Sequence, residues 1–139
     1  MKKTVVLVLF FLVVAVSGCA KTDKKAAPQN GGENSVVYKN VSMDEGIRIA
    51  KDNPDAVIVD VRREDEYKAG HIPGAVLLTM EKITEETAAK VLPDKNQMIL
   101  IYCRSGRRSK IAAKSLLKLG YTNLIEFGGI LDYKGEIEY

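Results

Sequence analysis

The sequence predicts an α/β domain with a mostly parallel five-stranded sheet and helices on both faces. From residue 36 onward, short apolar runs alternate with helix-like segments, which is typical of a parallel sheet. The run at residues 56–61 is continuous and β-branched, as expected of a strand that is buried on both faces. About 100 residues of this kind are enough to build one hydrophobic core.

Five strands and four helices are expected along this segment. The strands are predicted at residues 36–38, 56–61, 75–78, 98–102 and 124–127. The helices are predicted at residues 42–52, 64–69, 81–92 and 109–119. Ser42 and Glu45 have the spacing of a capping box, which predicts the start of the first helix. On the last helix, one apolar face is expected from Ile111, Ala112, Leu116 and Leu119.

The N-terminus has the pattern of a secretory signal. Lys2 and Lys3 precede an unbroken apolar run at residues 5–16, and small residues follow it. A membrane-spanning helix needs about 20 apolar residues, so this run is short for a spanning segment. We therefore predict a signal peptide at residues 1–18, with an uncleaved anchor as the alternative.

Val16-Ser17-Gly18-Cys19 resembles the lipobox of bacterial lipoproteins. The resemblance implies that Cys19 is lipidated, becomes the new N-terminus and anchors an exported protein to a membrane, facing the periplasm or the cell exterior. Ala20 is not the aspartate that retains such proteins at an inner membrane, which favours an outer membrane where one exists. Residues 19–35 are poor in large apolar side chains and are predicted to be a flexible tether.

Charge and residue counts exclude several classes of partner. The formal net charge is +3, and removal of Lys2 and Lys3 with the signal would leave about +1. The arginines cluster locally instead of forming a basic face, so nucleic-acid binding is not expected. His71 is the only histidine and no cysteine pair has ligand spacing, so a metal site is not expected.

A single cysteine follows the apolar run at residues 98–102. If Cys19 is lipidated, Cys103 is the only remaining thiol, which indicates a reactive residue. It begins the segment Cys103-Arg104-Ser105-Gly106-Arg107-Arg108 and lies between a predicted strand and a predicted helix. Helix N-terminal amides and neighbouring arginines stabilise anions and thiolates, so a nucleophilic thiolate beside an anion pocket is predicted. An inert, buried cysteine is the alternative.

Four motifs in the predicted domain resemble the rhodanese family of sulfurtransferases in its single-domain form. The resemblance covers about residues 36–139. Its pieces are Val59-Asp60-Val61-Arg62 with Glu66-Tyr67, Gly70-His71-Ile72-Pro73-Gly74-Ala75, the cysteine loop at 103–108, and Gly128-Gly129. Many family members carry a tryptophan four residues after the glycine pair, where this chain has Tyr133.

The resemblance implies that Cys103 takes sulfane sulfur from thiosulfate, polysulfide or a persulfide and becomes a persulfide. Cyanide, a thiol or a protein cysteine would then accept the sulfur, and neither an organic cofactor nor a metal is expected for this reaction. The resemblance assigns binding of the anionic donor to Arg104, Ser105, Gly106, Arg107 and Arg108. It gives Asp60 and Arg62 a site-supporting role, and it places His71 in a structural turn.

Two other functions stay open from the sequence. Related phosphatases and arsenate reductases have five residues between the cysteine and the arginine of the loop, whereas Cys103 and Arg108 have four between them. A binding or redox-sensing module of the same fold is the second alternative, because an accessible thiolate of low pKa is readily oxidised.

Overall fold

A computed structural model describes residues 35–139. The predicted signal peptide (1–18), the lipidation site at Cys19 and all but the last residue of the predicted tether (19–35) lie outside the described residues and remain predictions. Within the described part of the chain, no helix is both long enough and apolar enough to cross a membrane.

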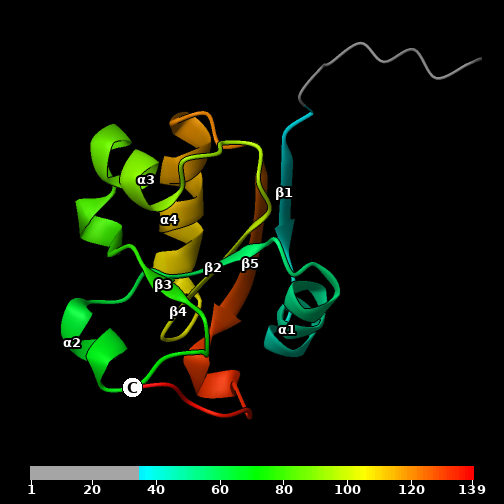
Figure 1. The fold of residues 1–139 in the computed structure, drawn as a ribbon, viewed down its shortest axis with the longest axis vertical. Helices are drawn as coiled ribbons and strands as arrows, with labels where there is room; N and C mark the ends of the chain where they lie inside the picture. Colours follow the sequence, from blue (N-terminus) through cyan, green and yellow to red (C-terminus); the bar gives the residue numbers. More distant parts are fainter. Residues whose placement is uncertain (1–34) are drawn as a thin grey trace, which may run out of the picture. The chain divides into compact units, whose positions relative to one another are not determined.

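Five parallel strands form one sheet in the order β1-β5-β4-β2-β3, which confirms the predicted fold class (Figure 1). The strands are β1 (Val37–Asn40), β2 (Val57–Asp60), β3 (Val76–Leu77), β4 (Ile99–Cys103) and β5 (Asn123–Gly129). The central strand β4 pairs with β2 and β5, and all of its residues are buried. Its last residue, Cys103, therefore lies at the carboxyl edge of the sheet, where open α/β folds place their ligands.

Four α-helices and two short 3₁₀ helices complete the domain. They are α1 (Met43–Asp52), α2 (Glu64–Lys68), η1 (Met80–Lys82), α3 (Glu85–Val91), α4 (Arg107–Lys118) and η2 (Ile130–Asp132). The predicted helix at 81–92 is thus two elements. Thr84 accepts a hydrogen bond from the amide of Thr87 and caps a new helix start, which divides the segment.

Two helix starts differ in detail from the prediction. Ser42 accepts a hydrogen bond from the amide of Glu45, but the Glu45 carboxylate pairs with Arg48, so only half of the predicted capping box forms. The helix α4 begins at Arg107, two residues before the predicted start at Ser109. Gly106 precedes it with a φ of 89°, a left-handed conformation that glycine adopts without strain.

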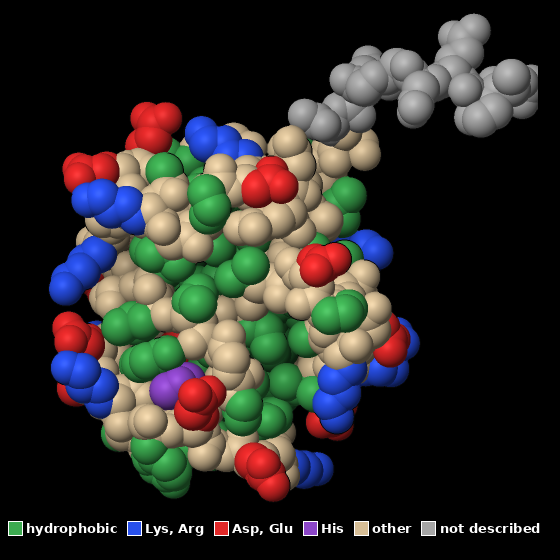
Figure 2. Space-filling model, viewed as in Figure 1, with side chains coloured by type: hydrophobic (Ala, Val, Ile, Leu, Met, Phe, Trp, Pro, Cys, Tyr) green, Lys and Arg blue, Asp and Glu red, His purple; other side chains and the backbone are tan. Residues whose placement is uncertain are grey.

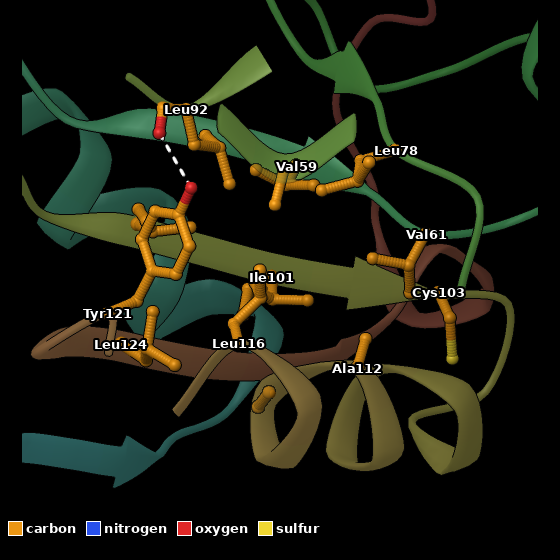
Figure 3. Packing of buried hydrophobic residues seen from close by; sticks show 13 residues of the cluster. Val59, Val61, Leu78, Leu92, Ile101, Cys103, Ala112, Leu116, Tyr121 and Leu124 are labelled. Carbon is orange, nitrogen blue, oxygen red and sulfur yellow. Dashed lines mark hydrogen bonds between the residues drawn. The ribbon is translucent and has the colours of Figure 1, made fainter. Parts of the chain in front are cut away.

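Alternate residues of β4 face opposite layers of the fold. Ile99, Ile101 and Cys103 pack in the core with α3 and α4, as Figure 3 shows for the α4 side. Leu100 and Tyr102 belong to the second core, beneath α1. The sulfur of Cys103 therefore points to the α4 side of the sheet.

The apolar face of α4 differs by one position from the predicted one. Ile111 is 43% exposed, so its predicted place in the core is wrong. Ala113 is buried instead, together with Ala112 and Leu116. Tyr121, which follows α4, closes this core by donating a hydrogen bond to the carbonyl of Leu92 at 2.7 Å (Figure 3).

On the molecular face in Figure 2, charged side chains of both signs lie mainly around the periphery, and hydrophobic side chains gather near the middle. The charge on this face is therefore mixed. The histidine, shown in purple, is His71, the only one in the sequence, and an acidic side chain lies beside it. The Glu138 carboxylate lies 3.8 Å from Nε2 of His71.

Gly46 allows α1 to approach β5 closely. A Cβ atom at this position would lie 2.4 Å from Phe127, whose ring is fully buried. Alanine in place of glycine normally stabilises a helix by about 1 kcal/mol, but overpacking a core costs about 1–3 kcal/mol.

We therefore predict that Gly46→Ala lowers the free energy of unfolding, measured by urea denaturation, by about 1–2 kcal/mol. Lys51→Ala, on the exposed side of the same helix, is the control and should change stability by less than about 0.5 kcal/mol. A more stable Gly46→Ala protein would show that α1 can move away from Phe127 at little cost.

Candidate active site

Cys103 lies where β4 ends and a three-residue turn leads into α4. The side chain is 1% exposed, and its sulfur points toward the first turn of α4 (Figure 3). The amide of Gly106 donates a hydrogen bond to this sulfur at 3.1 Å. The first amides of a helix have no partners within the helix, so this turn presents several donors to an anion.

The surroundings of Cys103 favour its thiolate. Burial alone would raise the pKa of the thiol, but hydrogen bonds from the Ser109 hydroxyl and from the amides of Ser109, Ser105 and Gly106 outweigh burial and lower it. The amides at the helix N-terminus therefore lower the pKa of Cys103, as predicted, and the Ser109 hydroxyl adds to their effect. Of the predicted arginines, Arg108 interacts with the thiolate through its charge.

Arg108, the last residue of the loop motif, is paired with Glu66 of α2. The two side chains form a bidentate ion pair with distances of 2.6 and 2.8 Å, and each is about one-sixth exposed. The bond from Arg108, together with a bond from the Arg63 amide, lowers the pKa of Glu66 to about 2 although burial opposes the shift. Arg108 therefore joins α2 to α4, while the resemblance assigned it to the bound anion.

A pocket of about 370 Å³ opens beside the cysteine turn. Its lining residues are Arg63, Glu66, Glu81, Arg104, Ser105, Arg107 and Arg108. Arg104 and Arg107 are exposed, and neither forms an ion pair with a carboxylate of residues 35–139. The structure therefore leaves these two guanidinium groups free to attract an anion to the pocket.

The end of β5 packs directly against the cysteine turn. Cys103 pairs with Gly129 in the sheet, and the amide of Leu131 donates to the carbonyl of Arg104 at 3.3 Å. A Cβ atom on Gly129 would lie 2.2 Å from that carbonyl oxygen. The close approach explains why the glycine pair accompanies the cysteine loop in the sequence.

Asp60 and Arg62 belong to a buried network on the α1 side of the sheet, opposite the Cys103 side chain. Arg62 donates to Asp60 at 2.7–3.0 Å and to the carbonyl of Gly70 at 2.7 Å. The Tyr102 hydroxyl donates to Asp60 at 2.8 Å and accepts from the amide of Ile72 at 3.1 Å. The network thus holds the turn at Gly70 against the sheet, and it does not bring Asp60 or Arg62 to the sulfur.

His71 occupies that turn, away from Cys103. Its ring stacks on Tyr67 at 3.7 Å, and its Nδ1 lies 3.0 Å from the Tyr67 carbonyl. Its backbone pairs with Glu138 near the C-terminus. Within residues 35–139, His, Cys, Asp and Glu side chains form no group of three or more that could hold a metal ion.

Three residues near the cysteine turn were not predicted as site residues. Glu66 was part of the motif but had no assigned role. Ser109 was predicted only as a helix start. Glu126 is fully buried, and it interrupts the apolar run at 124–127, which was the one available sign of a special role.

Comparison with known proteins identifies the family. The model of the Rhodanese-like domain matches residues 42–136. Thiosulfate sulfurtransferase PspE of Escherichia coli is 36% identical over 74 residues, which cover 53% of this chain and 70% of PspE. Thiosulfate sulfurtransferase GlpE of Coxiella burnetii is 33% identical over 100 residues, which cover 71% of this chain and 90% of GlpE.

Longer proteins also contain a matching segment. The tRNA uridine(34) hydroxylase of Photorhabdus laumondii is 35% identical over 86 residues, and the match spans 24% of its length. Among solved structures, the "rhodanese with anions from E. coli" is 31% identical, with a TM-score of 0.55, and the match covers 60% of this chain and 96% of the other. The chain therefore belongs to the rhodanese-like family, whose members include thiosulfate sulfurtransferases.

Proposed function

We propose that this protein is a sulfurtransferase that carries sulfane sulfur on Cys103. The observation that carries the proposal is the cysteine itself: a buried thiol whose pKa is lowered by amide and hydroxyl donors at a helix N-terminus. The names of PspE and GlpE and the bound anions of the solved rhodanese support the same chemistry. Thiosulfate, polysulfide or a small persulfide is the proposed donor.

In the first half-reaction, the Cys103 thiolate attacks the outer sulfur of the donor. With thiosulfate, a bond forms between Sγ and the sulfane sulfur, the sulfur–sulfur bond of the donor breaks, and sulfite leaves with the electron pair. The persulfide that remains carries a negative charge. The amides of Ser105, Gly106 and Ser109, in the turn and at the start of α4, can stabilise this charge without reorganisation.

In the second half-reaction, a nucleophile attacks the outer sulfur of the persulfide. The bond from Sγ to that sulfur breaks, and its electron pair returns to Cys103 as the thiolate. Cyanide, a small thiol or a protein cysteine can act as the acceptor. The same donors stabilise the leaving thiolate, which makes Cys103 a good leaving group as well as a good nucleophile.

Export and lipid anchoring through Cys19 are also part of the proposal. They rest on the signal-like residues 1–18 and on the lipobox resemblance at residues 16–19. The test is labelling with a radioactive fatty acid. Label on the native chain and none on the Cys19→Ser chain would support anchoring. Equal labelling of both chains would contradict it.

Cys103→Ser should reduce thiocyanate formation from thiosulfate and cyanide by at least ~10³-fold, because the hydroxyl cannot form a persulfide. The assay is the rate of thiocyanate production by the full chain in detergent, with far-ultraviolet circular dichroism as the check on folding. A folded Cys103→Ser protein with native turnover would reject Cys103 as the carrier. Hydrolysis of an aryl phosphate without thiocyanate formation would favour the phosphatase alternative.

Arg104→Ala and Arg107→Ala should each raise KM for thiosulfate roughly fivefold, which corresponds to about 1 kcal/mol for an exposed charge pair. The effect should shrink as salt screens the charges. The rate of alkylation by neutral iodoacetamide should stay near the native value, because neither arginine sets the thiol pKa.

The matched control for both arginines is Arg48→Ala, an exposed arginine on α1 that is paired with Glu45 and Asp52. It should leave KM unchanged. If Arg104→Ala and Arg107→Ala also leave KM unchanged, the loop amides alone recognise the donor.

A further inference from the structure

One carboxylate in the pocket beside the cysteine turn has no cationic partner. Glu81 lines this pocket together with Arg104 and Arg107. It is exposed, and none of the ion pairs within residues 35–139 includes it. Binding of an anionic sulfur donor gives this residue no role, because a negative charge beside the pocket repels an anion.

The backbone at Glu81 is fixed against the body of the domain. Glu81 is the middle residue of η1. The amide of Met80 donates to the carbonyl of Val61 at 3.1 Å, and the amide of Lys82 donates to the carbonyl of Thr79 at 2.9 Å. The side chain of Met80 packs against the core beneath α4. The carboxylate of Glu81 is therefore carried to the pocket by an anchored turn.

The charge of Glu81 reaches the centre of the site. The hydrogen bond between Arg108 and Glu66 raises the pKa of Arg108, although burial opposes the shift. The charges of Cys103 and Glu81 act in the same direction as that bond. Arg108 therefore lies within electrostatic range of both groups, and a molecule that reacts at Cys103 enters the field of Glu81.

The pocket presents unpaired charges of both signs. Because Arg108 is neutralised by Glu66, two guanidinium groups remain free, those of Arg104 and Arg107, together with the carboxylate of Glu81. An inorganic dianion such as thiosulfate can use only the two cations. A molecule that carries both a carboxylate and an ammonium group can use all three, so the charges complement an amino acid better than an inorganic anion.

The space beside the cysteine turn continues past Glu81. A second pocket of about 370 Å³ is lined by Arg63, Glu64, Thr79, Glu81 and Lys82, so it shares Arg63 and Glu81 with the first pocket. Both volumes are within the range of about 300–1,000 Å³ that is typical of sites for small organic molecules. Glu81 therefore lies where the organic part of a substrate would extend from its reacting sulfur.

We propose that the sulfur acceptor is a thiol of the amino-acid type, and that Glu81 selects its ammonium group while Arg104 or Arg107 binds its carboxylate. The inference rests on the proposed function and names its acceptor class. The acceptor thiolate attacks the outer sulfur of the Cys103 persulfide, and a new sulfur–sulfur bond forms. The bond from Sγ breaks, its electron pair returns to Cys103, and the acceptor leaves as a persulfide anion. Glu81 takes part in no bond change and determines specificity only.

The first test uses methanethiosulfonate reagents that modify Cys103 and differ in charge: aminoethyl (cationic), methyl (neutral) and sulfonatoethyl (anionic). The rate is measured in the full chain in detergent, by mass, on the peptide that contains Cys103. Relative to the neutral reagent, Glu81→Gln should slow the cationic reagent roughly threefold to fivefold, as expected for one exposed charge, and should accelerate the anionic reagent by a similar factor. Added salt should weaken both effects.

The matched control removes the same charge from the opposite edge of the sheet. Asp55 is exposed and precedes the start of β2, so Asp55→Asn should leave all three rates unchanged. Arg104→Ala should have the reverse effect of Glu81→Gln and slow the anionic reagent. Unchanged rates in Glu81→Gln, or an equal change for all three reagents, would overturn the proposal. An effect of Asp55→Asn as large as that of Glu81→Gln would also overturn it, because net charge would then account for both.

The second test compares acceptors, with thiosulfate as the donor and sulfite release as the readout. Each acceptor is compared between the native and Glu81→Gln proteins, so that its intrinsic reactivity cancels. The variant should raise KM for cysteine and cysteamine roughly threefold to fivefold and leave KM for mercaptoethanol and cyanide unchanged.

The two proposals fail in different ways. Equal changes of KM for all acceptors, with cyanide still active, would overturn the role of Glu81 and leave sulfur transfer intact. Sulfite release with no acceptor, cyanide included, would reject sulfur transfer itself and this acceptor with it. The charged reagents need no sulfur donor, so they report on the charge selection at Glu81 in either case.

Discussion

The active region depends on the set of hydrogen bonds that converge on the sulfur of Cys103. Burial at 1% exposure would by itself make this cysteine an inert core residue, because it raises the pKa of a thiol. Donors from the turn and from the first residues of α4 reverse the direction of that shift. The strand β4 holds the sulfur at the sheet edge, Gly106 allows the chain to enter the helix, and Gly129 allows β5 to pack beneath the turn.

Two carboxylates support the turn from different sides, and their environments separate their roles. Glu66 has a cationic partner, Arg108, which holds its pKa at about 2, so it acts as a permanent charge that joins α2 to α4. Glu126 has only neutral partners and lies behind Ser109. The first arrangement fixes the loop, and the second joins the first turn of α4 to β5 through the Ser109 hydroxyl. The free cations at the pocket are then Arg104 and Arg107.

The parallel sheet could be predicted because alternating apolar runs and helix-like segments have few packing solutions. The position of Cys103 followed from the same pattern. The partner of Arg108 could not be predicted, since the direction of a guanidinium depends on Glu66, 42 residues earlier in the chain. Ser109 and Glu126 are 17 residues apart, and only the packing of α4 on β5 brings them together. The division of the segment at 81–92 into two elements could not be predicted either, because it depends on Thr84, which caps a new helix start.

The most direct test of sulfur transfer is the intact mass of the full chain in detergent after incubation with thiosulfate and removal of the excess donor. The native protein should gain the mass of one sulfur atom, located on the peptide that contains Cys103, and should lose it when cyanide is added. The Cys103→Ser protein should gain nothing. A native protein that takes up no sulfur from thiosulfate, polysulfide or a small persulfide would contradict the proposed function.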